Sequence, residues 1–452
     1  MDINLVQNIF DKGDYRKVLD LVKDDTTIEA HYFKERSLSN LGYIEEAIGE
    51  IVNNKELFEK ELYWKVIYNL DYSTLLWNKG LLDKALDFVK IAFELSNNLD
   101  DQRNYDPFEN KLSLQGLIIQ RIGVIYDNKG DYKKALQYGL QALELRKKSN
   151  DLKGIVNSCL NIGYVYELRG YTKEAFKYYE EGRILAEKHN FKRLLSVLYA
   201  NLCSIYGNKG DLAKAIEYAL KSITICEEIQ DISQNIAFAY MAASECYFEV
   251  GDVKNGEKYF EKLRIISEKN SVPRIKEVYL YQKAIRLKKS KRLLQKAEAE
   301  KILRDFVSKP RIRKGLTILA LKHLLELLLL EYKMTQEEEA LKEFKSYLQE
   351  IERIAIDQQI WGTLISVLQL KARLHVIEGE YDKAVLDLEE AIKISLENEM
   401  DNYLENIKDE KENIEKDFKK MQHTIQLNEN LAKKLTDTNV MDYIVSAIKL
   451  VK

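Results

Sequence analysis

The sequence contains few of the residues that interrupt helices. Only 3 prolines and 19 glycines occur in 452 residues, and several of the glycines recur at regular intervals. A protein built from β-strands needs many tight turns, which are rich in glycine, proline and asparagine. The composition therefore predicts an all-α protein.

The sequence also has little excess of charge of either sign, no paired cysteines and no long uninterrupted apolar run. The 70 basic and 73 acidic residues leave a net charge of -3, which argues against a general affinity for nucleic acid. The most apolar stretch, residues 316–332, is interrupted by Lys322, His323 and Glu326, so it predicts a buried amphipathic helix and no membrane span. The four cysteines show no paired spacing, and the first residues do not resemble a secretory signal. We therefore expect reduced thiols, a cytoplasmic location and no membrane partner.

A repeated pattern is the strongest signal in the chain. The stretch DNKGDYKKALQYGLQALEL, residues 127–145, is followed 40 residues later by ELRGYTKEAFKYYEEGRIL. Two further turns, which lack glycine, align at Arg292 and Thr335, and the intervals between turns run from 29 to 50 residues. A period of this size predicts a solenoid of stacked units. The turn glycines are Gly13, Gly42, Gly80, Gly130, Gly170, Gly210, Gly251 and Gly379.

Each regular unit places small and aromatic residues at fixed distances from its turn. A small residue stands seven positions before the turn glycine and an aromatic residue four before it, and a small and an aromatic residue follow at five and eight. These positions lie on one face of each helix, so the two helices of a unit should pack antiparallel, small against large. One such pair cannot bury its apolar face alone, so neighbouring pairs must stack. The aromatic pairs are Tyr126 and Tyr138, Tyr166 and Tyr178, Tyr206 and Tyr218, and Tyr247 and Tyr259.

These residues resemble the tetratricopeptide repeat (TPR). The stretch LNIGYVYELRGYTKEAFKYYEEG from Leu160 carries the Leu/Ile-Gly-x-x-Tyr and Gly-x-x-x-x-Ala features of that repeat in register. The resemblance covers residues 1–395 and is strongest from Gly80 to Gly251. The period near 40 is similar to that of the longer-helix variant found in bacterial peptide-sensing regulators and in some eukaryotic cargo or polarity adaptors. It implies a right-handed α-solenoid of nine to ten helix hairpins with a C-terminal helical cap.

The regularity of the pattern divides the chain into four segments. We expect irregular N-terminal capping units over residues 1–60, a regular array over 61–270, a degenerate array over 271–395, and a C-terminal helical segment over 396–452. In the last segment a narrow apolar stripe either caps the array or mediates self-association through residues 403–425. The stripe consists of Tyr403, Ile407, Ile414, Phe418, Met421 and Ile425.

The motifs of enzymes and cofactor sites are missing. The sequence has no Gly-rich phosphate loop, His-Glu-x-x-His pair, Cys-x-x-Cys pair or Gly-x-Ser-x-Gly turn, and its five histidines are isolated from one another. We therefore predict no enzymatic activity, no cofactor and no metal site.

The resemblance implies where a partner would bind. In TPR proteins the first helix of each pair lines the concave side, and in peptide-binding members an asparagine nine residues before the turn holds the backbone of an extended ligand. This position is occupied here by Arg121, Asn161 and Asn201 in consecutive units. The alternative is that the asparagines cap or bridge helices within the stack. The predicted site for a peptide or protein partner in the concave groove comprises Arg121, Asn161, Asn201, Gln120, Tyr164, Asn157 and Asn128.

A basic region offers a second candidate surface. Residues 286–314 contain twelve Lys or Arg against three acidic residues, a density that attracts nucleic acid or an acidic partner. A helix of roughly 22 Å separates its two basic runs, which disfavours a nucleic-acid site. The sequence thus favours a non-catalytic scaffold or adaptor that holds a peptide or protein segment. The alternatives are a peptide-responsive regulatory receptor that changes its superhelical pitch, and a structural homo-oligomer.

Overall fold

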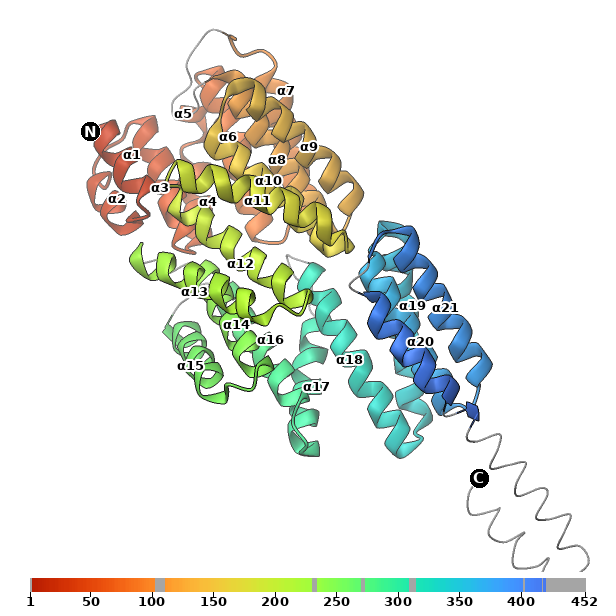
Figure 1. Cartoon of the computed structure of the whole chain (residues 1–452). Coiled ribbons are helices and arrows are strands. Elements are labelled where there is room, and N and C mark those ends of the chain that lie inside the picture. The colour runs from red at the N-terminus through yellow and green to blue at the C-terminus, as the bar shows by residue number, and fades with distance from the viewer. Residues whose placement is uncertain are drawn as a thin grey trace, which may run out of the picture.

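The computed structural model describes residues 2–101, 110–229, 234–269, 273–308, 314–400, 403–416 and 418–419. Every regular element within these ranges is a helix, and the helices form ten hairpins stacked into a right-handed α-solenoid (Figure 1). A single turn, α5 (Lys55–Phe58), follows the second hairpin. The hairpins are α1 (Ile3–Asp11) with α2 (Tyr15–Leu21), α3 (Ile28–Asn40) with α4 (Ile44–Asn53), α6 (Leu62–Asn78) with α7 (Leu82–Ser96), α8 (Lys111–Lys129) with α9 (Tyr132–Ser149), α10 (Leu152–Arg169) with α11 (Thr172–Lys188), α12 (Lys192–Asn208) with α13 (Leu212–Glu228), α14 (Gln234–Glu249) with α15 (Val253–Lys269), α16 (Pro273–Lys288) with α17 (Leu293–Ser308), α18 (Lys314–Thr335) with α19 (Glu338–Gln358), and α20 (Trp361–Ile377) with α21 (Tyr381–Glu397).

The turn glycines are confirmed by their backbone geometry. All eight have a positive φ, between 77° and 92°, where a residue with a side chain is strained by about 1–2 kcal/mol. One turn without glycine differs from the alignment. Thr335 is the last residue of α18, and the left-handed position falls one residue later, on Gln336 with a φ of 58°.

The predicted tyrosine pairs stack across their hairpins. Their ring centroids lie 5.5, 5.7, 5.3 and 5.7 Å apart in hairpins four to seven, with interplanar angles of at most 14°. The small residues beside them permit this approach, because a Cβ added to Gly123 would lie 3.2 Å from the carbonyl oxygen of Ala135. Each aromatic pair adds about 0.5–1.5 kcal/mol beyond the area it buries.

The first helices of the hairpins line the inner side of the solenoid. From α6 to α20, each first helix contacts the first helix of the next hairpin, and these contacts are closer than those between consecutive second helices. In a curved row the members approach each other most closely on the inner side. We call this surface of first helices the inner wall.

Successive turns of the superhelix rest on one another. Arg193, at the start of α12 in the sixth hairpin, donates from Nη1 to the hydroxyl of Tyr15 in the first hairpin at 2.9 Å. The turn after α10, in the fifth hairpin, likewise packs on the start of α20 in the tenth, and Figure 1 shows the blue α20 and α21 against the ends of α10 and α11. Contacts recur five hairpins apart, so one superhelical turn comprises about five hairpins.

The described part of the C-terminal segment packs on the last hairpin. Ile407 is fully buried, Lys411 bonds to Glu389 at 2.7 Å, and Phe418 stacks on Tyr381 with centroids 4.9 Å apart. The first four residues of the apolar stripe are therefore used within the chain. Met421 and Ile425 lie outside the described residues, and self-association through 403–425 stays a prediction. Among the helices that can be described, none is long and apolar enough to cross a membrane.

Candidate functional site

Two of the predicted residues offer free amides on the inner wall. Asn161 on α10 and Asn201 on α12 occupy equivalent positions in consecutive hairpins, and both are half-buried. Neither side chain forms a hydrogen bond with another described residue. Each amide can therefore donate and accept a hydrogen bond with the backbone of a ligand.

Three other predicted residues are engaged within the stack. Gln120 on α8 donates from Nε2 to the carbonyl oxygen of Asn157 on α10 at 3.4 Å, which joins the two helices. Asn128 and Asn157 each donate to the carbonyl four residues earlier, at 2.6 and 3.2 Å. Gln120 and Asn128 are also buried. A ligand that used these amide groups would have to replace existing hydrogen bonds.

Tyr164 lies where two superhelical turns meet. A Cβ added to Gly315 near the start of α18 would lie 3.1 Å from the Tyr164 hydroxyl and 3.4 Å from a methyl of Leu168. The structure thus places Tyr164 on the same face of α10 as Asn161, at the point where α10 meets α18.

Arg121 occupies an enclosed site beside an ion pair. Its guanidinium lies 5.2 Å from the ring centroid of Trp77, and its Nε is buried without a hydrogen-bond partner. Burial lowers the pKa of Arg121 to about 10, against the attraction of Asp71. Asp71 itself is held at two points by Arg36, at 2.8 and 3.1 Å.

Sequence reasoning gave little weight to Glu167, which joins two helices of the inner wall, α10 and α12, to the second helix α11. Its carboxylate on α10 accepts a hydrogen bond from the Tyr179 hydroxyl on α11 at 2.8 Å and from Ser204 on α12 at 2.6 Å. Burial raises the pKa of Glu167 although both hydrogen bonds act in the opposite direction. Glu167 therefore fixes the relative positions of the helices that carry Asn161 and Asn201.

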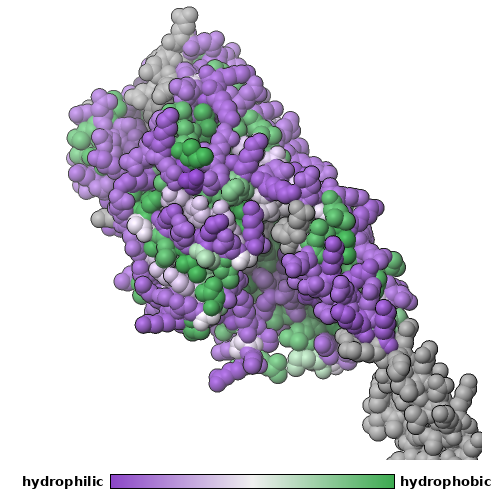
Figure 2. Space-filling model, in the orientation of Figure 1, coloured by the Kyte–Doolittle hydropathy of each residue, from purple (hydrophilic) through white to green (hydrophobic). Residues whose placement is uncertain are grey.

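A pocket of about 610 Å³ lies farther along the inner wall. It is formed by α18 and α20, which are consecutive first helices, and by the helix over residues 403–416, which follows α21. Figure 2 shows this face of the molecule hollowed between the part formed by α12–α17 and the part formed by α19–α21, with apolar side chains in the hollow. The lining residues are Glu326, Leu329, Leu330, Lys333, Leu370, Arg373, Val376, Ile377, Asn406, Asp409, Glu410, Asn413 and Ile414.

The pocket combines an apolar surface with fixed polar groups. Arg373 donates from Nε to Glu410 at 2.6 Å, and Gln369 donates to the same carboxylate at 2.7 Å. Burial raises the pKa of Glu326, but hydrogen bonding to His323 and the charge of Lys288 outweigh it and hold the pKa near 2. The volume and the mixed lining match those of sites that bind small ligands or a short peptide segment.

The sequence contained a signal for this pocket that the prediction did not use. Leu370 and Arg373 stand nine and six residues before Gly379, which are the positions of Asn161 and Tyr164 before Gly170. The same helix face was therefore identified, but in hairpins four to six. The prediction relied on an asparagine nine residues before the turn, and the ninth and tenth hairpins have no asparagine at that position.

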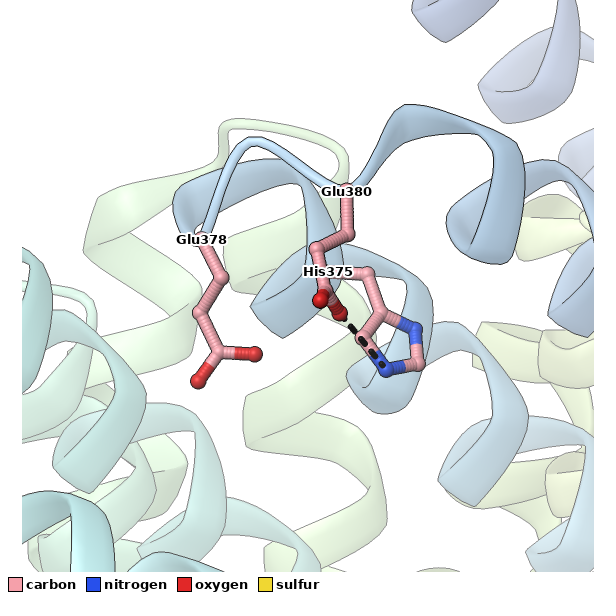
Figure 3. A group of neighbouring side chains, drawn as sticks. All are labelled: His375, Glu378 and Glu380. Carbon is pink, nitrogen blue, oxygen red and sulfur yellow. Dashed lines mark ion pairs between the residues drawn. The ribbon is translucent and has the colours of Figure 1, made fainter.

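A group of three potential metal ligands lies at the turn between α20 and α21. Ligand atoms of His375, Glu378 and Glu380 lie within 4.8 Å of one another (Figure 3). Lys345 pairs with Glu378 at 3.2 Å and Lys383 with Glu380 at 2.8 Å. These lysines neutralise both carboxylates, so the group forms an ion-pair network and gives no support for a metal site.

Three basic residues in the described part of the basic region have acidic partners. Arg286 pairs with Glu257, Lys288 with Glu326, and Arg304 with Glu343. Residues 309–313, which contain the second basic run, lie outside the described residues. Binding of nucleic acid or of an acidic partner here stays a prediction.

Comparison with known proteins places these features in a family context. The sequence matches the MalT-like TPR region over residues 108–401, which is more than half of the chain. Comparison with curated proteins finds no match.

Several solved structures share the fold. NprR in complex with its cognate peptide NprX is 16% identical with a TM-score of 0.54, and 77% of this chain and 98% of that chain are covered. The apo form of the quorum sensor NprR from B. thuringiensis is 14% identical with a TM-score of 0.52, covering 76% and 97%. The Rap conjugation gene regulator of the plasmid pLS20, in complex with the Phr* peptide, is 15% identical with a TM-score of 0.50, covering 78% and 97%. At these identities the likeness shows the fold alone.

Proposed function

Because the chain belongs to the family of MalT-like TPR regions, we propose that it is a non-catalytic scaffold that holds a peptide or an extended segment of a partner protein on its inner wall. The pocket between α18, α20 and residues 403–416 carries this proposal. It is formed by the same helix face that presents Asn161 and Asn201. The peptides in the NprR and Rap complexes give the proposal further support.

Binding would use preformed groups with little rearrangement of the wall. The methyl groups of Leu329, Leu370 and Ile414 offer apolar contact to ligand side chains. Polar atoms of Lys333 and Asn413 are available to pair with the ligand backbone or with a charged side chain. Because the helices are already fixed by packing, only the ligand loses conformational entropy on binding.

A pocket-filling substitution tests the proposal. We would immobilise the protein, apply an equimolar library of synthetic decapeptides and identify retained peptides by mass spectrometry. Leu370→Trp should reduce the retention of peptides selected by the wild type at least tenfold. Leu386→Trp, on the exposed side of α21 where Leu386 is 63% exposed, is the matched control and should retain them.

The Asn161→Ala/Asn201→Ala variant extends the test to the predicted asparagines. Loss of the same peptides would assign both regions to one binding path. Equal retention by wild type and Leu370→Trp, or no retention by the wild type above a denatured sample, would contradict the proposal.

The contacts between superhelical turns favour a second candidate function. A ligand that fits better when the turns separate or approach would change the pitch, which is the behaviour of a peptide-responsive regulatory receptor. Small-angle scattering with and without a retained peptide measures this change directly. An unchanged radius of gyration at saturation would contradict the receptor function and leave only the scaffold function.

A further inference from the structure

We infer that Arg121 and Trp77 form an anion-binding subsite of the inner wall, which receives a carboxylate of the bound peptide. The inference rests on the proposed function and names the chemistry of the ligand. It starts from the absence of any ion-pair partner for Arg121 among the described residues.

Other enclosed arginines in the chain have partners. Arg36 is paired with Asp71 at two points, at 2.8 and 3.1 Å. Arg146 donates to the carbonyl oxygen of Gly154 at 2.7 Å and to Ser158 at 3.1 Å. Within the described ranges, Arg121 has only the face of the Trp77 ring as a partner.

The charges around Arg121 do not balance. Arg121 is repelled by both Arg36 and Arg146, and the carboxylates near these three arginines are Asp71 and Asp151. Glu35 does not restore the balance, because burial and then the repulsion of Asp71 raise the pKa of its carboxyl well above its ordinary value. One positive charge is left over in a poorly solvated site. A carboxylate that enters would neutralise it, and that neutralisation favours binding.

Trp77 contributes a second unsatisfied donor. Its indole Nε1 is buried and forms no hydrogen bond with any residue that the structure describes, and the same is true of Nε of Arg121. The two side chains come from α6 and α8, which are adjacent first helices. The ring also restricts the orientation of the guanidinium, whose planar set of donors matches the two oxygens of a carboxylate.

The subsite is in register with the asparagines. Arg121, Asn161 and Asn201 stand nine residues before the turn in consecutive hairpins. Packed helices lie 8–10 Å apart, and an extended peptide advances about 3.3 Å per residue. A peptide whose backbone is held at Asn161 and Asn201 therefore reaches Arg121 over about six residues, and an acidic group at that end would complete the contact.

Three synthetic heptapeptide libraries test the subsite. The first has free C-termini and all residue types, the second is amidated, and the third is amidated and lacks Asp and Glu. Wild-type protein should retain carboxylate-bearing peptides about tenfold to a hundredfold over the third library. Preference for the first library over the second identifies the terminal carboxylate, and equal retention of both identifies acidic side chains.

Variants distinguish a loss of the anion-binding subsite from a general loss of peptide binding on the inner wall. Arg121→Gln should lose the preference for carboxylate-bearing peptides but still retain neutral peptides. Trp77→Phe should weaken the same preference. Arg353→Gln, at a side chain 71% exposed on α19, is the matched control and should keep it. Thermal unfolding checks folding, and Arg121→Gln should not lower Tm because it removes an uncompensated buried charge. If the preference survives in Arg121→Gln, or if the wild type retains peptides without any preference, the inferred subsite is wrong but the proposed function stands. If the wild type retains no peptide, both the subsite and the proposed function are wrong.

Discussion

The guanidinium of Arg169 donates to the side-chain oxygen of Gln359 at 2.8 Å, although 190 residues separate the two in the sequence. Beside this contact the indole of Trp361 donates to the Tyr171 hydroxyl at 2.8 Å. In most repeat arrays each unit contacts only its neighbours. Here side chains join the fifth hairpin to the tenth, so the pitch of the superhelix is fixed by specific contacts between turns.

Gly170 is expected to be critical for this contact. A Cβ at residue 170 would overlap the terminal methyl of Met400 and lie 3.0 Å from the backbone nitrogen of Gly362. Gly170→Ala should therefore combine left-handed backbone strain with overpacking, at a cost of about 2–4 kcal/mol in the free energy of unfolding. Denaturant titration followed by circular dichroism measures the loss.

Gly210→Ala is the matched control for this substitution. Gly210 has a similar φ of 77°, but nothing lies within 4 Å of an added Cβ. It should cost only the backbone strain, about 1–2 kcal/mol. Equal losses for the two variants would show that the contact between turns adds nothing to stability.

The ion pair of Arg36 and Asp71 predicts an asymmetry between two arginines. Arg36→Gln leaves the buried carboxylate of Asp71 without its partner, which typically costs 3–5 kcal/mol. Arg121→Gln leaves no carboxylate unpaired and should not destabilise the protein. Thermal melts of both variants compare the two effects, and a larger loss for Arg121→Gln would be inconsistent with this account of the charges.

Glu245 should make stability depend on pH. Burial, with repulsion from Glu249 and against the attraction of Lys289, raises its pKa from 4.5 to about 7. Between these values the folded state keeps a proton that the unfolded state has lost, so stability falls as pH rises. Glu245→Gln should abolish this component, which is about 3 kcal/mol. Denaturation at pH 4.5 and 7.5 tests it, since the difference between wild type and variant should change between the two values.

The turn positions and the hairpin packing could be predicted because they are local. Gly130 and Tyr126 with Tyr138 lie within one hairpin, and the spacing of small and aromatic residues determines which helix faces meet. The turn at Thr335 was misplaced by one residue because Gln336 carries no glycine-like signal. Asparagine and glutamine can adopt the left-handed conformation, but they also occur in many other conformations, so their presence in the sequence does not identify a turn.

The candidate site was less accessible to sequence reasoning. The periodicity identified the helix face that carries Asn161 and Arg121, but several residues on that face bond within the stack, as Gln120 does with Asn157. The pocket at Leu370 and Arg373 lies on the same face and carries no asparagine. Its existence depends on how three helices diverge, which spacing does not specify.

The sequence by itself determined the hairpin, the period and the inward face, because each follows from side chains within about 40 residues of one another. The tertiary structure alone decided which part of that face is open. Contacts such as those of Arg169 with Gln359, and of Arg193 with Tyr15, join residues about five hairpins apart. Small rotations between neighbouring hairpins accumulate along the array, so the meeting of distant turns depends on their sum and not on any single unit.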